Sequence, residues 1–187
     1  SDILPMSAVA PTTKDIPYDY VAKFKLQGKA GNRVQDVINI SVEGGFVAVA
    51  IGYSFIPAKL QITNPTPVAT LAANSLSGLI DLLSTADRDT LAQCLFVRLC
   101  GIDFKYSIVD SGTGRELQNQ PIHNIAGLGE ASGDRPFRPL AKPMMFMPRS
   151  TIRIEVEEIS EGSIYTGAEL YIVLHGYKIL GYGTAMP

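Results

Sequence analysis

The feature that most constrains this fold is the alternating polarity of residues 151–180, near the C-terminal end of the chain. Residues 151–158 alternate between apolar and charged side chains, which predicts a strand with one buried face and one face in water. Residues 169–180 carry apolar side chains on both faces, which predicts a strand that lies deeper in the protein. Gly162 and Gly167 supply backbone freedom for the turns between them. We therefore expect the two strands to pair as an antiparallel sheet core.

Similar alternation earlier in the chain predicts further strands at residues 20–26, 34–42, 46–55 and 102–109. In the strand at 46–55, one face is expected to be large and apolar. It consists of Val47, Val49, Ile51, Tyr53 and Phe55. The opposite face carries only small residues, which predicts that another group packs very close to it.

Helical periodicity is confined to one region of the chain. Apolar residues recur with helical spacing within 69–84, and Thr85 has the character of an N-cap for a second helix. This helix ends near Gln93 or continues to Leu99, because residues 95–99 fit a strand equally well. Many short strands and one or two helices predict a mainly β protein, an antiparallel sandwich with jelly-roll topology. We expect a single domain at residues 18–187, preceded at 1–17 by an extended, proline-rich arm that contacts a neighbouring subunit.

The composition limits the classes of function. Charged residues make up 18% of the chain, against about 25% in typical soluble domains, which favours a surface partly covered by partners. The formal net charge of -2 lacks the excess positive charge that is typical of proteins that bind nucleic acids directly. No apolar run reaches the about 20 residues of a membrane-spanning helix, so no membrane partner is expected. The N-terminus lacks a secretory pattern. Cys94 and Cys100 are spaced too widely for a disulfide on a strand or a helix, which predicts reduced thiols and assembly in a reducing cytoplasm.

The two histidines are the first candidates for chemistry. His123 follows a proline in a loop, and His175 lies in the last predicted strand. Neither has a carboxylate or a cysteine at metal-ligand spacing, and metal sites need clustered ligands. We expect no catalytic or metal role for either residue, and a core or interface position for His175.

Two glycine-containing segments and an acidic group are the remaining candidates. In residues 110–116 we favour a hairpin turn, in which Asp110 caps backbone amides and pairs with Arg115, over a phosphate or nucleophile loop. Residues 127–134 lack the strand and helix context of a dinucleotide fingerprint. The acidic residues of 155–161 are expected along a wet strand face rather than around calcium. The sequence therefore predicts no cofactor, no metal and no enzyme activity.

The proline-rich segment 136–148 is the strongest candidate for an interface. Its prolines exclude a helix and predict an extended or edge strand. Its apolar residues are too numerous for a free surface, so either the protein's own core or a partner should cover them. The arginines around it could hold carboxylates of a neighbouring subunit. With three prolines of the arm, the candidate interface residues are Pro5, Pro11, Pro17, Arg135, Phe137, Arg138, Leu140, Met144, Met145, Phe146, Met147 and Arg149.

Three runs in the last 90 or so residues carry a resemblance to a known class of proteins. They read IDFKYSIVDSGTGRELQNQPIHNIAGLG, DRPFRPLAKPMMFMPRSTIRIEVEEIS and ELYIVLHGYKILG, and the earlier strand GGFVAVAIGYSF fits the same style. Together they resemble virion structural proteins of tailed bacteriophages, at the head surface or at the head–tail neck.

The resemblance implies a self-assembling β-sandwich subunit in a ring, collar or capsid-bound oligomer, with a decoration or neck role that stabilises or connects the head. Its partners would be copies of itself and the major capsid, portal or tail proteins, in a virion assembled in the host cytoplasm. The alternative is a receptor- or carbohydrate-binding sandwich on the virion surface, which the lack of Trp disfavours. A cupin-type oxygenase would need more converging histidines than the chain has.

Overall fold

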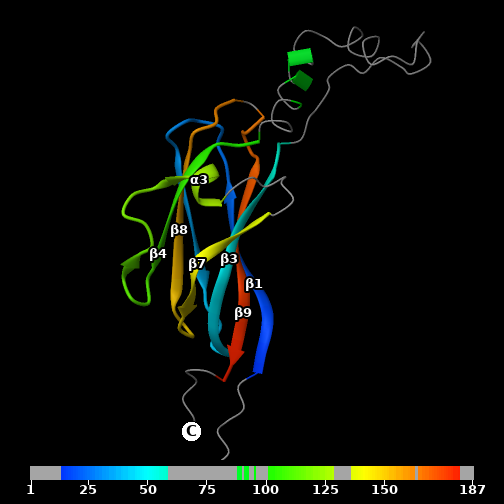
Figure 1. The fold of residues 1–187 in the computed structure, drawn as a ribbon. Helices are drawn as coiled ribbons and strands as arrows, with labels where there is room; N and C mark the ends of the chain where they lie inside the picture. The colour runs from blue at the N-terminus through cyan, green and yellow to red at the C-terminus, as the bar shows by residue number, and fades with distance from the viewer. Residues whose placement is uncertain are drawn as a thin grey trace, which may run out of the picture.

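A computed structural model describes residues 14–58, 88–89, 91–92, 95, 101–128, 136–162 and 164–181 (Figure 1). The strands of this part are β1 (Lys14–Lys25), β2 (Arg33–Asn39), β3 (Gly44–Ile56), β4 (Phe104–Asp110), β5 (Arg115–Glu116), β6 (Ile122–His123), β7 (Phe137–Phe146), β8 (Thr151–Glu158) and β9 (Glu169–Leu180), and a short helix, α3, covers Asn124–Leu128. The helix expected at 69–84 and both cysteines lie outside the described residues. Of the helix expected from Thr85, residues 88, 89, 91, 92 and 95 are described and are helical.

The strands form two antiparallel sheets that pack face to face (Figure 1). Sheet A has the order β1-β9-β3-β7, and sheet B has the order β2-β8-β4-β5, with β6 also paired to β4. Along the chain the long strands alternate between the two sheets, and the short strands β5 and β6 both belong to sheet B. The prediction of a mainly β, antiparallel sandwich is therefore confirmed.

The core lies between the two sheets and is built from the inward face of each alternating strand. In β1 the alternate residues Tyr20, Ala22 and Phe24 are all buried. The same holds for β8 and β4, whose inward side chains are Ile152, Ile154, Val156, Phe104, Tyr106 and Ile108. Burying each large apolar side chain contributes about 1.5–3 kcal/mol, which makes this face the main determinant of the fold.

The expected pairing of β8 with β9 is wrong. β8 lies between β2 and β4 in sheet B, whereas β9 lies between β1 and β3 in sheet A. The chain between them crosses from one sheet to the other, with Gly162 and Gly167 at positive φ. Alternation specifies a strand and its inward face, but it does not specify which strand becomes the hydrogen-bonded neighbour.

The expected apolar face of β3 is correct for Ile51, Tyr53 and Phe55 but wrong for Val47 and Val49, because a bulge changes the parity of the strand. The register of β3 against β9 shifts between Ala48 and Ala50, so Val49 is an extra residue. Before the bulge Phe46 and Ala48 face the core, and after it Ile51 and Tyr53 do. The expected close packing on the small face is found at Gly52, where an added Cβ would lie 2.8 Å from the Phe137 ring.

The proline-rich segment forms β7 at the edge of sheet A, as predicted. Between Pro139 and Met144 four residues of β7 face the single residue Val49 of β3, so the strand is strongly bulged there. Prolines and bulges both interrupt the row of free backbone groups that an edge strand offers to another chain. This edge is therefore poorly suited to pairing with a further strand.

The boundary between arm and domain lies earlier than predicted. β1 begins at Lys14, and Pro17 lies within it, opposite Tyr177 of β9. Because β1 is an edge strand of sheet A, a proline is tolerated there without loss of a ladder hydrogen bond. Residues 1–13 lie outside the described part of the chain.

Glu158 does not lie on the wet face where it was expected. Its side chain is 2% exposed and continues the inward-facing positions of β8. The carboxylate accepts hydrogen bonds from the amides of Gln27 and Gly28 and from Asn32 Nδ2, the last at 2.6 Å. These donors replace water and let Glu158 fasten the β1–β2 connection to sheet B.

Candidate functional site

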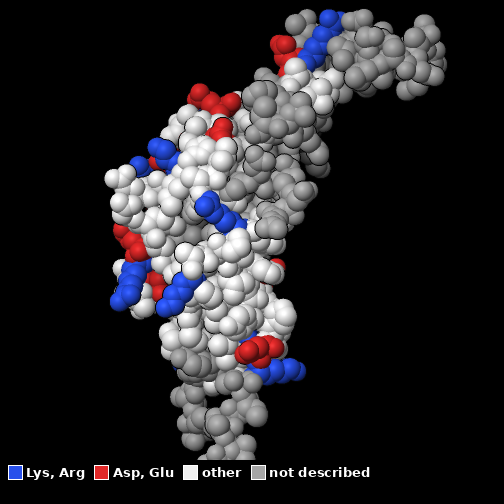
Figure 2. All heavy atoms as spheres, viewed as in Figure 1, with Lys and Arg blue, Asp and Glu red and all other residues white. Residues whose placement is uncertain are grey.

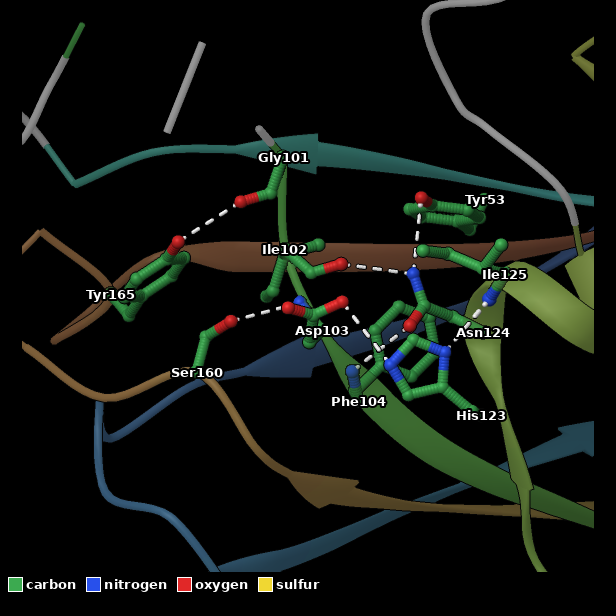
Figure 3. Close-up of polar contacts among 10 residues, drawn as sticks. All are labelled: Tyr53, Gly101, Ile102, Asp103, Phe104, His123, Asn124, Ile125, Ser160 and Tyr165. Carbon is green, nitrogen blue, oxygen red and sulfur yellow. Dashed lines mark hydrogen bonds and ion pairs between the residues drawn. The ribbon is translucent and has the colours of Figure 1, made fainter. Parts of the chain in front are cut away.

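A buried polar cluster surrounds Asn124, the first residue of α3 (Figure 3). Its side chain is fully buried, with Oδ1 accepting from the Phe104 amide at 3.1 Å. Its Nδ2 donates to the Ile102 carbonyl at 2.9 Å and to the Tyr53 hydroxyl at 3.2 Å. One amide side chain thereby joins α3, the start of β4 and the opposite sheet through β3.

Beside this cluster both ring nitrogens of His123 make polar contacts (Figure 3). Nε2 lies 3.1 Å from Asp103 Oδ1, and Nδ1 accepts a hydrogen bond from the Ile125 amide at 3.3 Å. Since Nδ1 is an acceptor, Nε2 carries the proton that faces the carboxylate. The ring therefore holds β6 and α3 against the residue that precedes β4.

The third polar side chain at this end, Ser160, does not complete a nucleophilic triad. Ser160 Oγ accepts from the Asp103 amide at 2.8 Å, whereas the His123 ring contacts Asp103 and Ile125 (Figure 3). A triad requires the nucleophile to hydrogen-bond to the histidine that takes its proton. Both histidine nitrogens are already engaged elsewhere, so this arrangement can position backbone but cannot activate the serine.

A second histidine–aspartate pair lies on the outer face of sheet A. His175 Nδ1 lies 2.6 Å from Asp19 Oδ1, and the two residues are opposite each other in β9 and β1. The Phe137 ring of β7 stacks on the imidazole, with centroids 4.8 Å apart. His175 is therefore not a core residue; it lies on a half-exposed surface that three strands of sheet A share.

The same face carries a charged cluster at the other end of β1 and β9. Lys23 Nζ lies 3.1 Å from Glu169, and the Tyr171 hydroxyl donates to the other Glu169 oxygen at 2.5 Å. The hydrogen bond from Tyr171, and then that from Lys23, lower the pKa of the Glu169 carboxyl. The bond to Glu169 in turn raises the pKa of Tyr171. All three groups are solvent-accessible, so the cluster tunes surface charge rather than stability.

The candidate interface residues divide between core and surface. Phe146 is 1% exposed and stacks against Phe46, so its expected interface position is wrong. Leu140 and Met144 are partly buried against the core. The exposed or half-exposed members are Pro17, Phe137, Arg138, Met145, Met147 and Arg149. Pro5, Pro11 and Arg135 lie outside the described residues.

Two of the arginines have backbone or structural roles in the described chain. Arg138 donates a hydrogen bond to the Ala126 carbonyl of α3. Arg149 has a positive φ of 65° in the turn between β7 and β8, and its amide donates to the Ile40 carbonyl. Both residues hold loops of this subunit, which leaves their contact with a partner as a prediction.

The turn at residues 110–114 has the predicted structure with one difference. Asp110 Oδ1 accepts from the Gly112 amide at 2.9 Å, and its other oxygen accepts from Thr113 Oγ1 at 3.0 Å. The expected ion pair with Arg115 is not formed, because the carboxylate turns toward the loop and is largely buried. The turn is therefore a capped hairpin connection between β4 and β5.

Other kinds of site are absent from the described residues. In that part of the chain no three His, Cys, Asp or Glu side chains converge as metal ligands. The described residues also contain no helix with the length and apolar character needed to cross a membrane. Sequence reasoning missed both histidine–aspartate pairs, because their partners are far apart in the chain and meet only through the sheet topology.

Comparisons with known proteins give no family. No family model and no curated protein match this chain. The crystal structure of GEBA250068378 from Sulfurospirillum deleyianum matches with 14% sequence identity and a TM-score of 0.33. The match covers 92% of this chain and 99% of that one.

Proposed function

We propose that this chain is a non-enzymatic structural subunit of a bacteriophage virion, which self-assembles and stabilises or connects the head. It would act as a decoration or a neck and collar component, with copies of itself and the major capsid, portal or tail proteins as partners. The proposal combines the sequence resemblance with one structural observation, the order of the strands.

The strand order is the observation that carries the proposal. An eight-stranded jelly roll has two four-stranded sheets with a fixed strand order. If β5 and β6 together count as one strand, that order is the one expected for β1-β9-β3-β7 and β2-β8-β4-β5. Jelly rolls occur in viral capsid proteins and in lectins, so the topology supports a virion subunit or a binding module. Because a fold alone does not determine a function, the choice between these two rests on the surface.

The described surface favours assembly over sugar binding. Sugar sites commonly present aromatic rings in a shallow groove, whereas Tyr18 is the one aromatic side chain among the exposed large hydrophobic residues of the described part. The other exposed members are mostly aliphatic or Met, such as Val21, Val42, Met145 and Met147. Aliphatic and Met side chains at the surface are typical of contacts between proteins.

The polar geometry supports a role without catalysis. The two histidines are each engaged by a carboxylate, and the one beside a serine has both nitrogens occupied. In this proposal the N-terminal residues 1–13, together with the first residues of β1, strap onto a neighbouring subunit, and the exposed side chains of 137–147 contribute to the subunit contact.

Mass spectrometry of phage particles tests the proposal. Particles banded by density gradient from the bacterium that carries the gene should contain this chain at a fixed ratio to the major capsid protein. An abundant chain in the lysate that is absent from every particle fraction would refute a virion role. Binding to a glycan array by the purified chain, together with a few copies per particle, would instead favour the receptor-binding alternative.

A further inference from the structure

We infer that the outer face of sheet A docks onto the same face of a second copy of this chain, about a two-fold axis that reverses the strand direction. The inference rests on the proposed self-assembly and names the surface that performs it. It concerns the outward-facing residues of β1, β9 and β3 and the parts of β7 beside them, which we call the outer A face.

The register of sheet A arranges the outer A face in rows across the strands. The central row is Val21, Val173, Gly52 and Phe137. On one side of it lie the rows Asp19, His175, Ala50, Pro139 and Pro17, Tyr177, Val47, Met145. On the other side lie Lys23, Tyr171, Ser54 and then Lys25, Glu169, Ile56. Sheet B and α3 pack on the opposite side of sheet A, so the face is directed away from the core (Figure 1).

The interior of this face is nearly free of charge. Away from β1, the rows hold one acidic side chain, Glu169, and no lysine or arginine. Figure 2 shows charged side chains mainly toward the margins of the drawn surface, with mostly uncharged atoms between them. Val21 in the central row is 48% exposed and Met145 is 39% exposed, whereas Val47 and Ala50 of β3 are each 8% exposed, so a contact would rest mainly on β1, β9 and β7. An uncharged centre with a charged margin is the usual composition of a protein interface.

The charges at the margin are self-complementary. Along the outward side of β1, acidic Asp15 and Asp19 precede Val21, and basic Lys23 and Lys25 follow it. A two-fold axis that runs along the central row places Asp19 of one copy near Lys23 of the other. The acidic end of β1 in each copy then faces the basic end of β1 in the other copy. The side chains of the Asp19–His175 and Lys23–Glu169 pairs are partly exposed. Asp19 and Lys23 can therefore contact the second copy while they keep their partners within the subunit. A two-fold axis parallel to the strands would instead place β1 opposite β7, whose residues in these rows are uncharged.

The available area is sufficient for a stable contact. Four strands spaced about 4.8 Å apart and about 34 Å long give a face of roughly 650 Å². Two copies would then bury at most about 1,300 Å² in total, which is near the lower limit of specific interfaces. Sheets pack in this way with their strands within about 30° of each other.

The edges of sheet A are less suitable than its face. Prolines and a bulge interrupt β7, and the Asp36 carboxylate accepts from the Lys23 amide at 3.0 Å on the free edge of β1. Both features block the addition of a strand. A second copy would therefore contact the outer A face through side chains and not extend the sheet.

A charge exchange tests the inference by analytical ultracentrifugation. One variant carries Asp15→Lys and Asp19→Lys, and the other carries Lys23→Glu and Lys25→Glu. Each alone should dimerise at least about tenfold more weakly than the wild type, because like charges then oppose each other. An equimolar mixture should recover dimers, since the heterodimer restores every opposite-charge contact.

The matched control carries Lys105→Glu and Arg153→Glu on the outer face of sheet B. It makes the same charge change as the variant with Lys23→Glu and Lys25→Glu. It should dimerise like the wild type. Thermal unfolding checks that all variants are folded. A wild type that stays monomeric, variants that dimerise normally, or a folded mixture without heterodimers would each overturn the inference. None of these outcomes decides the virion role, because the detection of the chain in particles is independent of this surface.

Discussion

Replacing Asn124 by alanine should destabilise the protein more than any other polar substitution near α3. The side chain is fully buried and satisfies the Phe104 amide and the Ile102 carbonyl, which have no water to replace it. Leaving a buried backbone group without a partner costs about 1–3 kcal/mol, so the two groups together should cost about 2–6 kcal/mol. A domain of this size has a total stability of about 5–15 kcal/mol, so the loss is a large fraction of it.

Urea denaturation followed by circular dichroism measures this change. With a central value of about 4 kcal/mol, we also expect the melting temperature to fall by about 8–16 °C. His123→Ala is the matched control, because its contacts are at the surface and should contribute less than about 1 kcal/mol. If Asn124→Ala unfolds within about 1 kcal/mol of the wild type, the cluster does not hold α3 to the two sheets, and the reasoning is refuted.

Three further substitutions test other buried groups. Glu158→Gln should cost about 1–3 kcal/mol in urea denaturation, because its added amide donor faces backbone amides; an unchanged midpoint would contradict the hydrogen-bond account. Gly176→Ala should cost about 3 kcal/mol or more, since the new methyl group overlaps the Val47 carbonyl oxygen; normal stability would mean that β3 and β9 separate easily. Burial raises the pKa of Tyr106, so the unfolded state loses this proton first and stability falls as the pH rises above about 10. Tyr106→Phe should reduce that alkaline loss in pH-dependent unfolding, and an identical pH profile would show that the group does not contribute.

Local patterns predicted the strands and their inward faces well, because these depend on side-chain alternation alone. The buried side of β1 and of β8 follows directly from residues such as Phe24 and Ile154. The same alternation places Glu158 on the inward face of β8. We expected it on the wet face because it is acidic. Only the three donors that converge on its carboxylate, which come from another strand connection, explain why the position is tolerated.

Features that depend on topology could not be predicted in this way. The assignment of β8 and β9 to different sheets reflects the whole strand order, and no local residue encodes it. The bulge at Val49 reverses the face of β3 without a proline or a charged residue to mark it. The pairing of Asp19 with His175 likewise needs the register between two strands that are separated by most of the chain.

The mass of the purified full-length chain in solution tests most directly the claim that this protein works by assembling. Light scattering coupled to size exclusion should give a defined multiple of the 20.1 kDa subunit mass that is maintained over a wide concentration range. A mass of one subunit at every concentration, for a chain with a cooperative melting transition, would contradict self-assembly.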